Sequence, residues 1–144
     1  MDKLFTIGYE GADLKEFLTV LKNAGTDVLL DVRELPMSRR KGFSKNALKA
    51  ALAEVGIDYR HEKRLGSPKD VRHRLRENWD YNRFFNDFNQ HLRKQMALLD
   101  QLTEELTGNV ALMCYEKDHT TCHRSSVGDM FARKLDLEPI HLSV

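Results

Sequence analysis

The residues most capable of chemistry lie in one short window of the sequence. "ALMCYEKDHTTCHRSS", residues 111–126, contains both cysteines of the 144-residue chain, and an apolar run ends at the first of them. Thiols, imidazoles, a carboxylate and a guanidinium this close together can form a metal site, an activated nucleophile or an anion site. The residues concerned are Cys114, Glu116, His119, Cys122, His123 and Arg124.

The two cysteines allow three interpretations. A metal could be held by Cys114 and Cys122 with Glu116 and either His119 or His123, although seven residues separate the thiols where common zinc knuckles have two. Cys122 could instead be a nucleophile, because a helix N-terminus lowers the pKa of a thiol. Both cysteines could also be inert and buried, as free cysteines often are. The pattern assigns no particular metal or cofactor.

Arg124 is unusual for its position. It falls in the first turn of a predicted helix, where the macrodipole disfavours a cation. A salt bridge to Asp31 or Glu116 would compensate for this. Alternatively, Arg124 and the free N–H groups of the helix start, beside His123, would hold an anionic ligand.

These residues need a scaffold, and the hydrophobic pattern predicts one. The continuous apolar run of "DVLLDVR", for example, is typical of a fully buried parallel strand. Strands alternating with helices predict a single compact α/β domain over residues 1–144, with a mostly parallel sheet and helices on both faces. We expect strands over 3–11, 27–33, 57–62, 109–116 and 137–144, and helices over 13–25, 45–55, 80–106 and 122–135.

Polar residues gather where the predicted strands end. In open α/β sheets, ligands bind outside the carboxyl ends of the strands. The loop "SRRKGF", residues 38–43, follows one of these ends and could clamp phosphates, with Phe43 stacking on a base. Alternatively, the loop is exposed with Phe43 packed beneath it, and Asp31 and Arg33 pair with each other and hold the loop. The predicted catalytic residues are Glu10, Cys114, Glu116 and Cys122. The predicted substrate- or anion-binding residues are Tyr9, Asp31, Arg33, Ser38, Arg39, His123 and Arg124.

The charge of the chain is distributed unevenly. Its net charge is +1, yet residues 33–76 contain 13 Lys and Arg against five Asp and Glu. Such a basic segment indicates an anionic partner, either a small molecule or a nucleic acid, unless it only forms solvated loops and helix faces.

The composition and the N-terminal residues predict where in the cell the protein is located. No apolar run approaches the ~20 residues of a membrane span, and residues 1–10 lack the layout of a signal peptide. We therefore expect a cytoplasmic protein with free thiols and no membrane partner.

Several short motifs resemble a known family. "TIGYEG" at 6–11, "DVR" at 31–33, "SR" at 38–39, "CYE" at 114–116 and "CHR" at 122–124 are similar to those of the family called domain of unknown function 488. The resemblance covers nearly the whole chain. It implies a compact α/β domain without an established reaction, and some members are described as DNA-repair proteins.

The layout of the chain is also faintly similar to that of rhodaneses. The segment from Cys114 to Arg124 is, however, longer and more polar than the compact anion-cradling loop of rhodaneses. Sulfur transfer by Cys114 is therefore not expected.

The residues favour an enzyme that acts on a phosphate-bearing substrate, a nucleotide or nucleic acid, at the carboxyl edge of the sheet. Arginines would bind the anion, and carboxylates would do general acid/base work. Two alternatives remain: a non-catalytic nucleic-acid-binding or repair-associated module, and a metal-binding redox or sensor protein.

Overall fold

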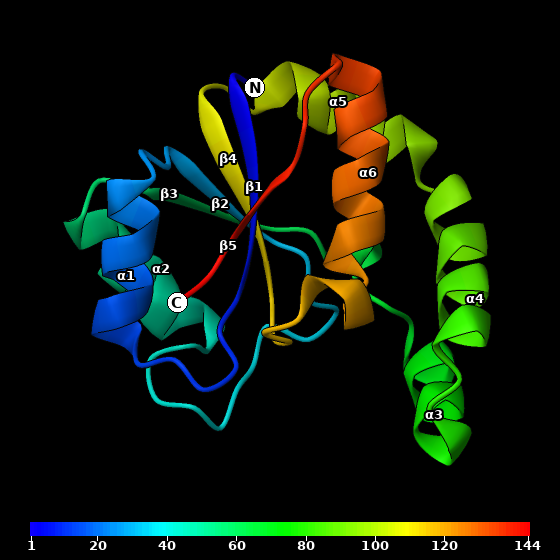
Figure 1. Ribbon diagram of the computed structural model, residues 1–144. Coiled ribbons are helices and arrows are strands. Elements are labelled where there is room, and N and C mark those ends of the chain that lie inside the picture. The colour runs from blue at the N-terminus through cyan, green and yellow to red at the C-terminus, as the bar shows by residue number, and fades with distance from the viewer.

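A five-stranded parallel sheet forms the centre of the molecule (Figure 1). The computed structural model describes residues 1–144. The strands lie in the order β3-β2-β4-β1-β5. Their bounds are β1 Lys3–Gly8, β2 Val28–Asp31, β3 Asp58–His61, β4 Asn109–Cys114 and β5 Ile140–Leu142.

Helices cover both faces of this sheet, with an apolar core under each (Figure 1). On one face Phe17 and Leu21 of α1 and Leu48 of α2 pack on the sheet. On the other face Leu99 of α5 and Phe131 of α6 do the same. The prediction of an α/β domain with helices on both faces is confirmed. The helices are α1 Leu14–Asn23, α2 Lys45–Glu54, α3 Lys69–Asn78, α4 Tyr81–Arg93, α5 Met96–Glu105 and α6 Arg124–Leu135.

The burial of each strand follows from its place in the sheet. The central strands β1, β2 and β4 are buried almost throughout, because helices cover them from both sides. The edge strands β3 and β5 are short and partly exposed. None of the helices is long and apolar enough to pass through a membrane.

The prediction of one helix over 80–106 is wrong, because the chain turns between α4 and α5. The N–H groups of Lys94 and Gln95 donate to carbonyls only three residues back, those of His91 and Leu92, which tightens the last turn and ends α4. No glycine or proline marks this break in the sequence. Apolar residues continue at helical spacing on both sides of it, because both helices bury a face in the same core.

The carboxyl ends of β1, β2 and β4 meet at one edge of the sheet. β4 lies between β1 and β2 and pairs with both in parallel, with Cys114 opposite Gly8 and Met113 opposite Asp31. The segments that follow these three strands therefore begin side by side. This topology brings residues near positions 9, 33 and 115 together.

Phe88 connects α4 to the core and to this edge. It is fully buried, and its ring lies 5.1 Å from that of His123. We expect Phe88→Ala to lower the free energy of unfolding by about 3–5 kcal/mol, because it leaves a cavity between α4 and the sheet. Urea denaturation would measure this, with the half-buried neighbour Phe85→Ala as control. Equal losses in the two variants would contradict this role.

Candidate functional site

A cleft of about 1010 Å³ opens at the carboxyl edge of the sheet. Its walls come from the segment after β1, the segment after β2, α3 with the start of α4, and the segment after β4. Five arginines and three glutamates line it, together with several aromatic side chains. This cleft is where the fold brings distant parts of the sequence to one surface.

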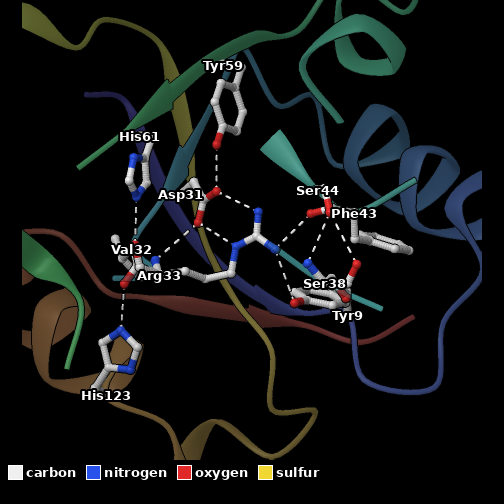
Figure 2. Close-up of polar contacts among 10 residues, drawn as sticks. All are labelled: Tyr9, Asp31, Val32, Arg33, Ser38, Phe43, Ser44, Tyr59, His61 and His123. Carbon is white, nitrogen blue, oxygen red and sulfur yellow. Dashed lines mark hydrogen bonds and ion pairs between the residues drawn. The ribbon is translucent and has the colours of Figure 1, made fainter. Parts of the chain in front are cut away.

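A buried ion pair forms the wall behind the cleft (Figure 2). The carboxylate of Asp31 accepts hydrogen bonds from Nε and Nη2 of Arg33, at 2.9 and 2.8 Å, and from the hydroxyl of Tyr59, at 2.6 Å. Burial lowers the pKa of Arg33, but its bonds to Asp31 outweigh this effect and raise the pKa above its usual value. Burial and the bond to Asp31 raise the pKa of Tyr59. Arg33 thus stays charged and Tyr59 stays neutral at neutral pH.

The same guanidinium fixes the loop after β2. Nη1 of Arg33 donates to the carbonyl of Phe43, at 2.7 Å, and to the hydroxyl of Tyr9, at 3.1 Å. Phe43 is fully buried and stacks on Tyr9 with 4.6 Å between the ring centroids. The expectation that Phe43 stacks on a base is therefore wrong, whereas the alternative, with Phe43 packed beneath the loop and Arg33 paired with Asp31, matches the structure.

Ser38 and its neighbours give the loop a defined shape. The hydroxyl of Ser44 accepts a hydrogen bond from the N–H of Ser38 and donates one to its carbonyl (Figure 2). The hydroxyl of Ser38 accepts one from the N–H of Arg40, and Nε of Arg40 donates to the carbonyl of Ala12. This loop presents Ser38 and Arg39 to the cleft.

The segment after β4 packs tightly against the end of β1. A Cβ atom on Gly8 would lie only 1.8 Å from the carbonyl oxygen of Glu116, so no other residue fits there. Arg124 is 1% exposed, and its guanidinium donates to the carbonyls of Glu116 and Lys117. Arg124 forms no ion pair with Asp31 or Glu116, and it does not line the cleft. Its charge instead supports the main chain of the turn.

Two carboxylates at the cleft have different surroundings. Glu10 is exposed, and its Oε1 accepts a hydrogen bond from the N–H of Lys117, at 3.0 Å. Oε2 of Glu116 is buried and has no hydrogen-bond partner. Burial raises the pKa of Glu116 to about 7, and the charge of Cys122 adds to the rise. The Glu116 carboxyl is thus able to give up or take a proton near neutral pH.

Two thiols and an imidazole come together at the back wall of the cleft, where only Cys122 lies behind the lining residues. Sγ of Cys114, Sγ of Cys122 and a ring nitrogen of His123 all lie within 4.8 Å of one another, and all three residues are buried. Burial raises the pKa of Cys122, but its bonds to Cys114 and His123 and the charge of Arg124 outweigh this and lower it well below its usual value. These three residues have the donor types of a metal site.

The cleft also presents charged and aromatic groups that have no internal role. Arg39 and Arg76 line it without any hydrogen bond or ion pair to the rest of the protein, whereas Arg72 pairs with Glu34 at 3.0 Å. Trp79 is 59% exposed and adopts a left-handed conformation (φ 55°) at the end of α3. A bulky residue is rarely found in this conformation, and such strain is common at functional sites.

Most of the predicted site residues come together. Tyr9, Glu10, Arg33, Ser38, Arg39, Cys114, Glu116 and His123 line the cleft. Asp31, Cys122 and Arg124 lie behind its wall and do not line it. Among the lining residues, Arg72, Arg76, Trp79 and Tyr115 are not predicted, and Arg40 is predicted only as part of the loop 38–43. The basic surplus of residues 33–76 is the signal that could have found the arginines.

The Asp31–Arg33 pair gives a stability prediction. Asp31→Asn leaves the 5%-exposed guanidinium of Arg33 without its counter-charge, so we expect a loss of about 3–5 kcal/mol in the free energy of unfolding. The control is Arg60→Gln, which breaks an ion pair with Glu105 on the surface and should cost much less. Chemical denaturation would measure both. If Asp31→Asn cost no more than the control, the pair would not organise the site.

Comparison with known families gives a match to the family described as "Domain of unknown function DUF488", over residues 13–131. Comparison with curated proteins found no match. Comparison with solved structures found none either. The matched range runs from the N-cap of α1 into α6 and includes the segments after β2 and β4 that line the cleft. Because the match extends over most of the sequence, the chain belongs to the DUF488 family.

Proposed function

We propose that the protein is an enzyme that acts on a phosphate-bearing substrate, a nucleotide or nucleic acid, bound in the cleft at the carboxyl edge of the sheet. The observation that carries this proposal is the pairing of free guanidinium groups with exposed aromatic rings in one cleft. Arginine binds phosphate through charge-assisted hydrogen bonds, and aromatic rings stack on bases.

The cations fall into two groups with different roles. Arg33 and Arg72 are paired with carboxylates and mainly shape the wall. Arg39 and Arg76 come from different walls of the cleft and have no internal partner, so they are the groups that would bind phosphate. Trp79, three residues after Arg76, would stack on a base, with the exposed ring of Tyr115 as a second stacking surface.

The carboxylates would supply the chemistry. Glu10 and Glu116 both line the cleft, on segments that the hydrogen bond from Lys117 to Glu10 holds together. Two carboxylates beside a bound phosphate can act as general acid and general base. Glu116 is the stronger candidate of the two, because its buried Oε2 is unpartnered whereas Glu10 already supports the main chain.

The second candidate is a non-catalytic nucleic-acid-binding module. The exposed apolar side chains of Leu35 and Met37 border the same cleft, and the internal role of Glu10 also suits a binding surface without chemistry. Such a module would bind oligonucleotides with a strong dependence on salt and would turn nothing over.

Binding can be followed through the only tryptophan of the chain, Trp79. We expect mononucleotides or short oligonucleotides to change its fluorescence by stacking on it. Arg39→Gln and Arg76→Gln should each weaken binding roughly tenfold or more, and with oligonucleotides should reduce the salt slope by about 1. Arg93→Gln, on the exposed end of α4 outside the cleft, is the matched control. Unchanged affinity in both cleft variants would contradict the proposal.

Catalysis would be tested on Glu116. The wild type is screened for hydrolysis of chromogenic phosphate esters and labelled oligonucleotides, and any turnover found should fall by about 100-fold or more in Glu116→Gln. Binding should persist in this variant, because the Glu116 carboxyl would transfer a proton during the reaction, whereas the arginines would bind the phosphate. Glu104→Gln, on an exposed face of α5, serves as control. Binding without turnover in the wild type would favour the non-catalytic module.

A further inference from the structure

Two thiols and an imidazole converge on one point directly behind the cleft. Cys114 ends β4, whereas Cys122 and His123 come immediately before α6. We propose that Cys114, Cys122 and His123, here called the Cys2His cluster, bind a divalent metal ion of the zinc type, with an open coordination position that faces the cleft. This proposal goes beyond the proposed function, since metal binding can be established without any activity.

The distances suit such an ion. Tetrahedral zinc with bonds of about 2.3 Å to sulfur and 2.0–2.1 Å to nitrogen keeps its ligand atoms about 3.5–3.8 Å apart. Sγ of Cys114 lies 3.8 Å from Nδ1 of His123, and the remaining separations are no more than 4.8 Å. Small rotations of these side chains are therefore enough to close the site around a metal.

The imidazole is already oriented as a ligand. Nε2 of His123 lies 2.7 Å from the carbonyl oxygen of Val32 (Figure 2). A carbonyl only accepts, so Nε2 carries a proton and Nδ1 is the atom that faces the thiol of Cys114. Metal-bound histidines commonly donate their second N–H to a carbonyl in this way, which fixes the tautomer and the ring. Phe88 packs against the same ring and holds it further.

The open coordination position is inferred from which of the three ligand residues line the cleft. Cys114 and His123 line the cleft, and Cys122 lies behind them at 1% exposure. Glu116 lines the cleft next to them, and its Oε2 is buried without a hydrogen-bond partner. A water on the fourth position of the metal would give that oxygen a donor. Three protein ligands and one exchangeable position are the arrangement of catalytic zinc sites.

The alternative, a simple pair of redox-active cysteines, explains less of the geometry. A disulfide would need only the two sulfur atoms. It would leave unexplained why an oriented imidazole and an unpartnered carboxylate oxygen lie beside them.

The test uses the full chain, fully reduced and stripped of metal by a chelator that is then removed. It is titrated with Co²⁺ without oxygen, because cobalt reports thiolate ligands through charge-transfer absorption and tetrahedral geometry through intense visible bands. We expect both signals to saturate at one Co²⁺ per chain and to disappear when Zn²⁺ displaces the cobalt. A reduced wild type that gives neither signal overturns the proposal, whether or not its cysteines form a disulfide in air.

Substitutions of the three residues test which of them bind the metal. Cys114→Ser and Cys122→Ser should each lose thiolate charge-transfer intensity, and His123→Gln should weaken Co²⁺ binding. The losses of affinity should exceed the roughly 10–100-fold that is typical when an outer-shell partner is removed. His73→Gln, an exposed histidine on α3, should bind as the wild type does. Unchanged spectra in both serine variants would overturn the assignment.

A second measurement avoids the case in which a variant fails to fold. X-ray absorption of the zinc-loaded wild type should show two sulfur neighbours at about 2.3 Å with nitrogen or oxygen neighbours at about 2.0–2.1 Å. A shell of nitrogen and oxygen alone would mean adventitious binding and would contradict the proposal. Failure of the Trp79 fluorescence test would leave the result of X-ray absorption unaffected. Metal binding and nucleotide binding can therefore be contradicted independently of each other.

Discussion

The buried carboxylate of Asp31 is the constraint on which the rest of the site depends. An unpaired charge inside a protein is costly, so its surroundings must supply donors. Arg33 and Tyr59 supply them, and Arg33 in turn reaches the carbonyl of Phe43 and the hydroxyl of Tyr9 (Figure 2). One charge pair thus fixes β2, β3, the loop after β2 and the segment after β1 relative to one another.

A second constraint is the close approach of main chains at the end of β1. Gly8 leaves room for the carbonyl of Glu116, and Arg124 donates a hydrogen bond to that same carbonyl. An arginine that is 1% exposed is thereby used to hold a turn. The turn sets the position of Glu116 at the cleft and of Cys114 just before it, so the packing at Gly8 determines where the chemically capable groups lie.

The site therefore has two neighbouring environments. The cleft is open and lined by arginines and aromatic rings, which suits the recognition of an anionic, base-bearing ligand. At its back wall, the Cys2His cluster is buried, which suits a metal ion or thiol chemistry. Glu116 and His123 lie at the boundary between the two environments, and both contribute to the cleft surface.

The sequence by itself determined the layers of the fold and the edge where the site lies. The continuous apolar runs of β1, β2 and β4 require burial on both faces, and parallel strands place their carboxyl ends together. Glu10, Arg39, Cys114 and Glu116 could be placed at that edge for this reason.

The tertiary structure alone decided which polar groups face outward. Asp31, Arg124 and Phe43 have the residue types of ligand-binding groups, yet each is enclosed by its partners, some nearby in the chain and some, such as Tyr59 and Tyr9, from other segments. The break between α4 and α5 has no glycine or proline in the sequence to mark it either. A pattern read along the chain gives the period of burial, whereas the enclosure of a polar or aromatic side chain also depends on partners from other segments, such as Tyr59 for Asp31 and Tyr9 for Phe43.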